Sequence, residues 1–402
     1  MKSNNIFATC LLAVAVFVLV GCNRTIYPES RVDTTPATEI TFEDSDVRLI
    51  TLHHDSLHYS IGLYDNQISN INTIDINGEY YFITPTGCEL IEISKTDNGF
   101  TVNYLDYSGN LIRSFVALEE PVKDELIYQY SISPSGKWLS YKVVSGDYGM
   151  GYDFAPIQNV MLLKVNSMTP EKSEQITTNG GAISGKAAWS NNDQYLAFTD
   201  FDQYKIQQVY LYDLFQRKRL QITHFSTQFP FQEIFGLHWS SDSNYLAFAT
   251  VQPIRNETAL AYGSGGIYIA EIDSAETKIT QVYKNKGVNR SVFWWGSQNN
   301  MVFIANNEGK YLNDADYTIG WFDVREEKIV KTLTDFDLGL NQNIYFIIPV
   351  TQDNNFIGLF GKDLFIYDYV NNSLQKRDNT MFIGNLYFIT TPGGSSFSTG
   401  CN

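Results

Sequence analysis

The chain has 402 residues, and 44 acidic residues outnumber 28 lysine and arginine residues, so its formal net charge is −16. Such an acidic chain argues against nucleic acid and anionic lipid as primary partners, because both bind through clusters of lysine and arginine. Aromatic residues reach 14% and glycine is frequent, which is typical of many short strands and turns rather than of helices.

The first 22 residues predict an export signal. Lys2 gives a basic start, and an apolar run over residues 6–20 is shorter than the roughly 20 residues that a transmembrane helix needs. The run ends in Leu19-Val20-Gly21-Cys22, which resembles the bacterial lipoprotein signal and implies lipid attachment at Cys22. A secretory peptide with a chance cysteine is the alternative. No later stretch is apolar for long enough to span a bilayer, so we expect the lipid alone to anchor the chain.

Residues 23–45 predict a flexible tether, because they are rich in threonine, proline and acidic residues. Asn23 follows the cysteine directly. In lipoproteins of two-membrane bacteria an aspartate there usually signals retention in the inner membrane. Its absence favours the outer membrane where the organism has one, and we expect the chain to be lipid-anchored in the cell envelope, facing the periplasm or at the cell surface. Residues 46–402 then form the folded domain.

One short pattern recurs seven times along this domain. Its clearest copies are Ile132 to Tyr141, Trp189 to Phe198 and Trp239 to Phe248, each with a strand end, a polar turn and an alternating strand. Such a repeat predicts units that bury their apolar faces against one another. The anchors that precede the turns align at Ile83, Ile132, Trp189, Trp239, Trp295, Val350 and Ile389.

A second pattern, an alternating strand that ends in Asp or Asn, follows six of the seven anchors, as in Val209 to Asp213. Such a side chain can bond the backbone two residues on, so the pattern needs no ligand. Ile389 has no corner after it, whereas Leu52 to Ser56 supplies one before the first anchor. We therefore predict an all-β ring of seven four-stranded sheets, closed by two strands from each end of the chain. Six sheets are the alternative.

The three clear copies resemble the repeat of TolB-like β-propellers, whose hallmark is a Ser-Pro-Asp-Gly-Lys turn before an Ile-Ala-Phe strand. Ser133 to Lys137 comes nearest to the full turn, with Ser135 in the Asp position. The resemblance runs from about residue 46 to the end and implies a β-propeller of four-stranded blades. It implies little about activity, since one fold hosts many functions.

Cys88 and Cys401 are the two cysteines outside the signal, and two cysteines in an exported chain invite a disulfide. Their positions in the repeat count against it. Cys88 falls at the start of a second strand and Cys401 near the far end of the equivalent strand, about 20 Å apart. A disulfide spans at most about 7 Å between Cα atoms.

Unequal spacing from anchor to corner predicts three enlarged loops between second and third strands, at residues 145–157, 252–266 and 306–317. In a propeller these connections open on the same face as the links between blades. Their aromatic and polar content indicates a binding surface, although ordinary variation in loop length explains the same spacing. The candidate contact residues are Tyr148, Tyr152, Asp153, Phe154, Arg255, Asn256, Tyr262, Tyr311, Asp314 and Asp316.

Catalytic and metal-binding patterns are weak. Gly263 to Gly265 lacks the first glycine of a nucleophile elbow. His53 and His54 would point to opposite faces of a strand. The segment with Asp314 and Asp316 lacks the glycine and distal glutamate of a calcium loop. We therefore expect no catalytic residue, metal or cofactor.

These patterns favour a lipid-anchored envelope β-propeller that binds a protein or peptide through its long-loop face without catalysing a reaction. The TolB resemblance implies such a role for a periplasmic scaffold. The alternative is a secreted propeller that binds or cleaves glycans, since some enzymes share this repeat. Trp189, Trp239 and Trp295 occupy one repeat position, which favours packing between blades over stacking on sugars.

Overall fold

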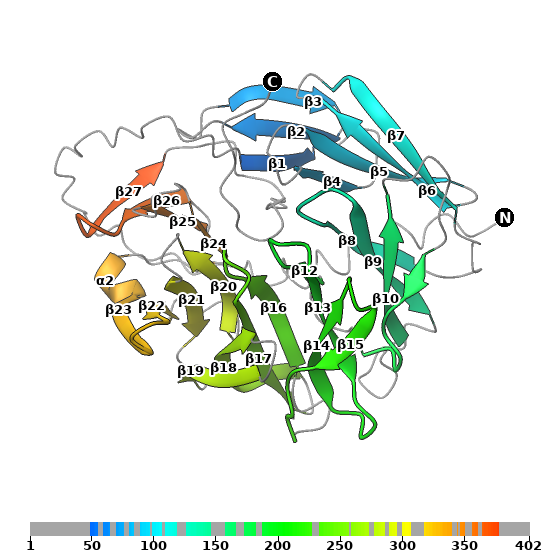
Figure 1. Cartoon of the computed structure of the whole chain (residues 1–402). Helices are drawn as coiled ribbons and strands as arrows, with labels where there is room; N and C mark the ends of the chain where they lie inside the picture. The colour runs from blue at the N-terminus through cyan, green and yellow to red at the C-terminus, as the bar shows by residue number, and fades with distance from the viewer. Residues whose placement is uncertain are drawn as a thin grey trace. The chain divides into compact units, whose positions relative to one another are not determined.

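The fold is described from a computed structural model of the chain (Figure 1). The described residues all belong to the unit Phe42–Asn402. Among them, no helix is long and apolar enough to cross a membrane. The described residues are 49–54, 59–64, 70–75, 80–83, 89–96, 99–106, 109–118, 126–145, 157–165, 173–181, 187–226, 233–256, 259–272, 277–285, 289–295, 300–306, 317–339, 344, 346–349, 356–360 and 364–377.

This part of the chain forms antiparallel strands in seven sheets, with one short helix, α2 (Asp335–Leu338). Every sheet uses consecutive strands of the chain. The first sheet has three strands: β1 (Leu49–His54), β2 (Tyr59–Tyr64) and β3 (Asn70–Asp75).

The other six sheets have four strands each. Their strands are β4 (Tyr80–Ile83), β5 (Leu90–Thr96), β6 (Gly99–Leu105) and β7 (Leu111–Leu118); β8 (Leu126–Ile132), β9 (Trp138–Ser145), β10 (Ile157–Lys164) and β11 (Glu174–Gln175); β12 (Ala188–Trp189), β13 (Tyr195–Phe201), β14 (Gln207–Asp213) and β15 (Lys218–Gln221); β16 (Glu233–Trp239), β17 (Tyr245–Asn256), β18 (Ala259–Ile272) and β19 (Thr277–Asn285); β20 (Asn289–Trp295), β21 (Asn300–Asn306), β22 (Tyr317–Asp323) and β23 (Lys328–Thr334); and β24 (Phe346–Pro349), β25 (Phe356–Phe360), β26 (Leu364–Asp368) and β27 (Ser373–Arg377).

The hydrophobic core lies between consecutive sheets. Each of five buried clusters takes its residues from two successive four-stranded sheets. The first strands β8, β12, β16, β20 and β24 also contact one another in that order, and Figure 1 shows β12, β16 and β20 side by side. The sheets therefore pack face to face, and their first strands meet along one side.

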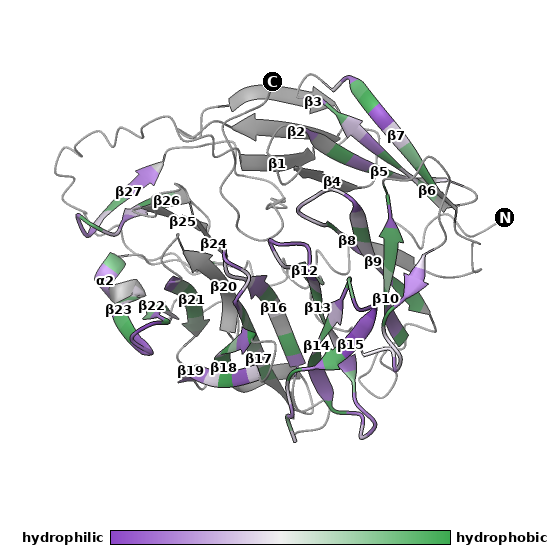
Figure 2. Ribbon diagram, viewed as in Figure 1, coloured by the Kyte–Doolittle hydropathy of each residue, from purple (hydrophilic) through white to green (hydrophobic). Residues whose placement is uncertain are grey.

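Strand alternation explains how one sheet serves two clusters. In β17, Leu246 and Phe248 pack toward the preceding sheet, whereas Ala247 and Ala249 pack toward the following one. Successive side chains of a strand point to opposite faces, so large and small residues alternate between the two interfaces. Figure 2 shows hydrophobic positions within β9 and β16, whereas the outermost strand β15 is mainly hydrophilic.

The repeated turn is a closed hydrogen-bonded unit. The Ser190 N–H donates to the carbonyl of Tyr195 (2.9 Å), and the Ser190 hydroxyl accepts from the Tyr195 N–H (2.8 Å). Asn192 accepts a hydrogen bond from Ser190 Oγ, and Asp193 adopts a positive φ of 57°. The same backbone pattern recurs in the turns of Ser133 and Ser240, with Gly136 and Ser243 at the positive-φ position.

At three of the predicted corners within the described residues, the Asp bonds its own turn, as the sequence predicts. Asp213 Oδ1 accepts the N–H groups of Phe215 (2.9 Å) and Gln216 (2.8 Å). Asp323 and Asp368 repeat this geometry. The corner pattern is therefore a local turn device.

The anchor tryptophans pack between sheets, which confirms that part of the prediction for two of them. Trp189 and Trp239 are 1% and 0% exposed. Trp189 Nε1 donates to the carbonyl of Ser131 (3.1 Å), and Trp239 Nε1 donates to the carbonyl of Ala188 (2.9 Å). Each acceptor lies one residue before the anchor of the preceding sheet. The side chain of Trp295 is not among those described.

The prediction of an all-β fold is confirmed, and six sheets have the expected four strands. The N-terminal sheet differs, because three strands pair there rather than two, and residues 70–75 form the additional β3. Its partner β2 runs antiparallel over five residue pairs. Ile389, Cys88 and Cys401 lie outside the described residues, as do Cys22 and the predicted tether.

Candidate binding face

Antiparallel connectivity divides each four-stranded sheet into two ends. The anchor turn and the corner turn lie at one end, because strands that run antiparallel return to the same side. The hairpins between second and third strands, together with the links between sheets, lie at the other end. We call this second end the hairpin face; it is where the sequence predicts the enlarged loops.

The segment 252–266 continues the strands rather than forming a loop. The β17–β18 pairing extends from Tyr245↔Glu271 to Asn256↔Ala259, with an irregularity between Val251 and Pro253. An extended hairpin pairs the backbone groups that an irregular loop would leave to water. Proline lacks an N–H group and is tolerated at such a bulge. The predicted loop is therefore an extended β-hairpin.

This hairpin carries three of the candidate contact residues. Arg255 pairs in register with Leu260, Asn256 with Ala259, and Tyr262 with Pro253. Because β16 and β19 pair only as far as Val251 and Gly265, these three residues lie on the part that extends past the neighbouring strands. The remaining candidates lie outside the described residues: Tyr148, Tyr152, Asp153, Phe154, Tyr311, Asp314 and Asp316.

A buried carboxylate at the hairpin face escaped the sequence reasoning. Asp200, near the end of β13, is 0% exposed. Its oxygens accept backbone N–H groups from Thr178, Gly181 and Phe201 at 2.8 Å each, and from Asn179 at 3.3 Å. Three of these donors, Thr178, Asn179 and Gly181, precede β12 in the chain and belong to the link from the preceding sheet. Asp200 therefore fastens that link to β13.

An arginine completes this cluster. Arg219 Nη1 lies 2.8 Å from Asp200 Oδ2 and 2.6 Å from the Thr178 hydroxyl, and the guanidinium lies 3.6 Å from the centre of the Tyr210 ring. With four N–H donors and one guanidinium, the Asp200 carboxylate has its acceptor positions filled. Its role is to hold the backbone. A charged residue inside the largely apolar segment Tyr195 to Phe201 is the sequence signal for it.

Three titratable side chains with shifted pKa values also escaped the sequence reasoning: Lys142 is buried, whereas Glu233 and His238 are partly buried. On β16, burial raises the pKa of Glu233 and lowers the pKa of His238 to about 4. Burial also lowers the pKa of Lys142, on β9, to about 7. Gly236 lies between the two β16 residues, at a register shift and with a φ of 65°. Such bulges re-aim side chains. In the described part of the chain, no three metal-binding side chains gather.

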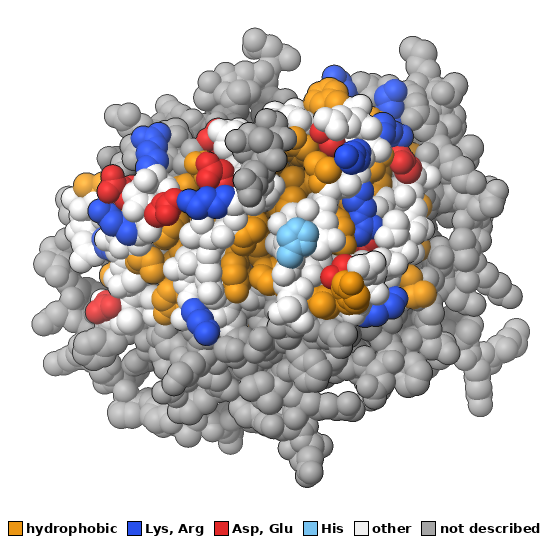
Figure 3. Space-filling view, turned by 60° about the horizontal axis from the view of Figure 1, so that its bottom comes forward, with side chains coloured by type: hydrophobic (Ala, Val, Ile, Leu, Met, Phe, Trp, Pro, Cys, Tyr) orange, Lys and Arg blue, Asp and Glu red, His pale blue; other side chains and the backbone are white. Residues whose placement is uncertain are grey.

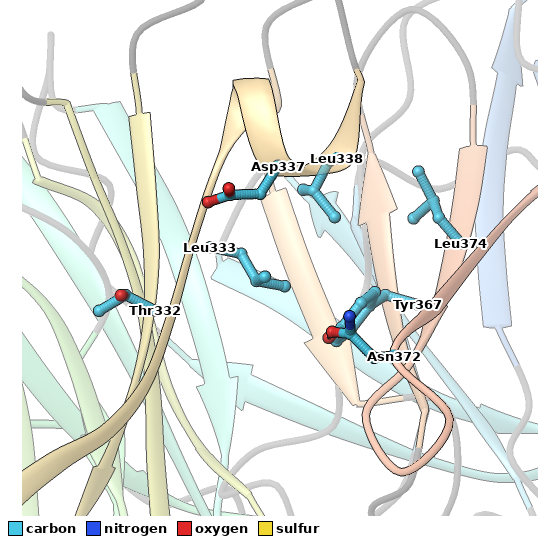
Figure 4. Close-up of a pocket in the computed structure, with 7 residues that line it drawn as sticks. All are labelled: Thr332, Leu333, Asp337, Leu338, Tyr367, Asn372 and Leu374. Carbon is cyan, nitrogen blue, oxygen red and sulfur yellow. The ribbon is translucent and has the colours of Figure 1, made fainter. Parts of the chain in front are cut away.

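A small cavity lies between the outer strands of two sheets (Figure 4). It measures about 380 Å³, and Leu338 of α2 and Leu374 of β27 border it. The Tyr367 hydroxyl, at its wall, donates to Asn372 Oδ1 at 2.6 Å, and burial raises the pKa of Tyr367 to about 12. The group has its own partner and stays neutral at physiological pH. The other lining residues are Thr332, Leu333 and Asp337.

The described surface has mixed charge. In the space-filling view, lysine and arginine side chains are interspersed with acidic ones, and hydrophobic side chains are exposed between them (Figure 3). The described surface in this view thus has no single-sign patch of the kind that nucleic acid needs.

No family model matches the chain, and no curated protein matches it in sequence. Solved structures do. The Pseudomonas aeruginosa periplasmic gluconolactonase is 13% identical, with a TM-score of 0.53 over 86% of this chain and 99% of its own. The tricorn protease is 10% identical, with a TM-score of 0.51 over 87% of this chain.

TolB from Acinetobacter baumannii is 13% identical, with a TM-score of 0.37, over 83% of this chain and 79% of its own. The chain spans 36% of the tricorn protease and 46% of the Porphyromonas gingivalis dipeptidyl peptidase 4 that it also matches. At these identities the likeness concerns architecture alone. Together with the face-to-face sheets, it shows that the chain has a β-propeller-type fold.

Proposed function

We propose that this chain is a lipid-anchored β-propeller of the cell envelope that binds a protein or peptide through its hairpin face without catalysing a reaction. The β17–β18 hairpin is the observation that carries this proposal, because its 12- and 14-residue strands exceed all others in the described chain. It extends past its sheet at the face where the sequence places the enlarged loops.

The hairpin supplies suitable contact groups. Arg255 and Tyr262 belong to the two residue types that, with tryptophan, are most enriched at the energetic centres of interfaces. Beyond Val251 and Gly265, the two hairpin strands pair with each other and with no further described strand. Their free edges can form backbone hydrogen bonds with an extended peptide.

The proposal includes a seven-bladed ring. The three-stranded first sheet is one strand short of the other six, and Ile389 falls at the repeat position that ends a first strand. In this proposal the C-terminal segment completes the first sheet and so removes its free edge, which is the usual hazard of large sheets. Lipid at Cys22 and the tether of residues 23–45 would hold the ring near the membrane.

A pull-down from detergent-solubilised envelope, run beside a glycan array, tests this function. We expect the chain to capture a protein reproducibly and the double variant Arg255→Ala/Tyr262→Ala to lose it. Arg325→Ala is the matched control, because Arg325 is exposed at a corner turn on the opposite end of the molecule. Glycan binding without any protein partner would contradict the proposal.

A glycan-binding or glycan-cleaving propeller is the second candidate. Glu233 and His238 on β16 favour it. The first strands of the sheets contact one another along one side, and these two residues place a carboxyl group and an imidazole on such a strand, both with pKa values shifted by burial. Activity or binding on glycans that Glu233→Gln and His238→Ala both abolish would support this candidate over the first.

A further inference from the structure

Three aromatic rings surround the ammonium group of Lys331 between the sheets β20–β23 and β24–β27. Lys331 Nζ lies 4.5 Å from the centre of the Tyr369 ring, 5.1 Å from that of Tyr367 and 5.8 Å from that of Trp321. The Trp321 ring lies 5.8 Å from the Tyr367 ring and 5.5 Å from the Tyr369 ring. We call these three rings the aromatic box. Each ring is near enough to attract a cation, since that attraction acts within about 6 Å of a ring centre.

Both sheets contribute to the aromatic box. Trp321 on β22 pairs in register with Lys331 on the outermost strand β23, so their side chains share one face of the sheet. Tyr367 is on β26 of the next sheet, and Tyr369 follows that strand. Trp321 and Tyr367 are buried, whereas Tyr369 and Lys331 are partly buried. The first two rings therefore form a buried floor, and the box is accessible from the side that Lys331 occupies.

The equivalent cations of two other sheets are fixed by carboxylates. Arg113 on β7 and Arg219 on β15 stand over tyrosine rings of their own sheets, and each also forms an ion pair with a carboxylate. Lys331 forms no ion pair with any residue that the structure describes. Its ammonium donates one hydrogen bond, to the carbonyl of Tyr369 at 3.3 Å. Lys331 is thus held mainly by ring faces.

A quaternary ammonium group suits these contacts better than a lysine does. A lysine ammonium is strongly hydrated and has three N–H donors, of which the box satisfies one and water must satisfy the rest. Burial accordingly lowers the pKa of Lys331, although the nearby carboxylate of Asp368 favours a positive charge. A trimethylammonium group has no N–H to satisfy, and aromatic faces are the protein groups that usually recognise it.

The cavity beside the box has room for the rest of such a ligand. It measures about 380 Å³ and lies between β23, α2 and β27 (Figure 4). Tyr367 belongs to both sites, because its ring lies beside Lys331 Nζ and it also lines the cavity. The exposed side chains of Asp337 and Asn372 line the cavity as well. A carboxylate and an amide can hydrogen-bond a hydroxyl group.

We propose that the aromatic box and this cavity bind a small quaternary ammonium compound of the choline class. The trimethylammonium group of the ligand takes the place of Lys331 Nζ, and its hydroxyl end lies in the cavity. The Lys331 side chain turns outward, so it is an internal occupant that covers the rings until a ligand displaces it. The site is separate from the hairpin face and does not rest on the function proposed above.

Isothermal titration calorimetry of the full chain in mild detergent tests this site. The two probes are choline and 3,3-dimethyl-1-butanol, a neutral compound of the same shape. We expect choline to bind about tenfold or more tightly than the neutral compound, because only a cation is attracted by the ring faces. Choline, and not the neutral compound, should also raise the midpoint temperature of thermal unfolding of the wild-type chain.

Two substitutions locate the binding site. Lys331→Ala should bind choline several-fold more tightly than wild type, because no internal cation competes for the rings. Tyr369→Leu should weaken binding about tenfold, since it removes the partly exposed ring. Lys328→Ala is the matched control and should change nothing, because Lys328 is exposed on the same strand and pairs with Glu326. Circular dichroism of each variant verifies the fold, and Lys331→Gln replaces the alanine variant if that one does not fold.

Three results would overturn the proposal. Equal affinity for choline and its neutral analogue would show that the rings do not select a cation. Absence of choline binding in both wild type and the Lys331 variant would leave Lys331 as a packing contact between two sheets. Choline binding that Tyr369→Leu leaves unchanged would place the ligand outside the aromatic box.

Discussion

The two ends of the sheets are built in different ways. At the turn end, three successive turns repeat one hydrogen-bond pattern and contact each other: Asp193 accepts the Ser135 N–H, and Asn191 donates to the carbonyl of Ser240. At the hairpin face, one sheet uses the buried Asp200 and the next uses an extended hairpin. The regular turn end, which carries the anchor and corner turns, indicates a scaffold. The hairpin face differs from sheet to sheet, so a binding site specific to this protein is expected there.

Removing an anchor tryptophan should have the largest effect on the turn end. Trp239→Ala empties a fully buried site and removes the hydrogen bond to Ala188. We expect a loss of about 3–5 kcal/mol in the free energy of unfolding, measured by urea denaturation. Trp189→Ala should cost a similar amount. Tolerance of both substitutions would show that the sheets do not depend on these contacts.

At the hairpin face, Asp200→Ala should also destabilise strongly. It leaves the Arg219 guanidinium, 19% exposed, without its carboxylate, and four N–H groups without their acceptor. We expect a cost of about 3 kcal/mol in the same denaturation experiment. Asp202→Ala is the control, because Asp202 is only partly buried and bonds its own turn. Equal costs for the two would contradict a special role for Asp200.

Lys142 makes the free energy of unfolding depend on pH. Its pKa is about 7 in the fold and near 10.5 when exposed, so between these values the unfolded chain binds more protons. Above pH 10.5 the side chain is neutral in both states and costs no stability. As the pH falls toward 7, protonation of the unfolded chain lowers the free energy of unfolding. Wild type should therefore gain stability relative to Lys142→Met as the pH rises from 7 to 10. Parallel pH profiles of the two proteins would refute this assignment.

Substitution of a single turn glycine should have the smallest effect on stability. Gly136 has a φ of 70°, and a Cβ there would meet nothing nearer than the Tyr104 hydroxyl at 4.0 Å. Gly136→Ala therefore costs backbone energy alone, about 1–2 kcal/mol. The midpoint temperature of thermal unfolding should fall by a few degrees. A larger loss would mean that the turn end is less tolerant than its Asp193 and Ser243 equivalents indicate.

The regular end was readable from the sequence because it depends on local chemistry. Serine, a polar third residue and a corner aspartate bond within their own turns, so position in the repeat predicts geometry. Strand alternation likewise predicted the core between sheets. The anchor tryptophans could be assigned to packing for the same reason.

The hairpin face was less readable because its contacts join residues far apart in the sequence. Asp200 bonds residues 19 to 22 positions earlier, in a link with no repeat signature. The length of 252–266 showed an insertion, but glycine, proline and tyrosine together read as a loop. Its strand pairing depends on cross-strand register, which composition does not encode. The third N-terminal strand, β3, was missed because residues 70–75 precede the first anchor and carry no repeat residue.

Shortening the β17–β18 hairpin tests the central claim most directly. Residues 253–262 are replaced by Asn-Gly, which suits a two-residue hairpin turn, and the variant is compared with wild type in thermal unfolding and in envelope pull-down. We predict an unchanged unfolding midpoint together with loss of the captured protein. Retention of the captured protein, or a large fall in the midpoint, would contradict the division between a scaffold end and a binding end.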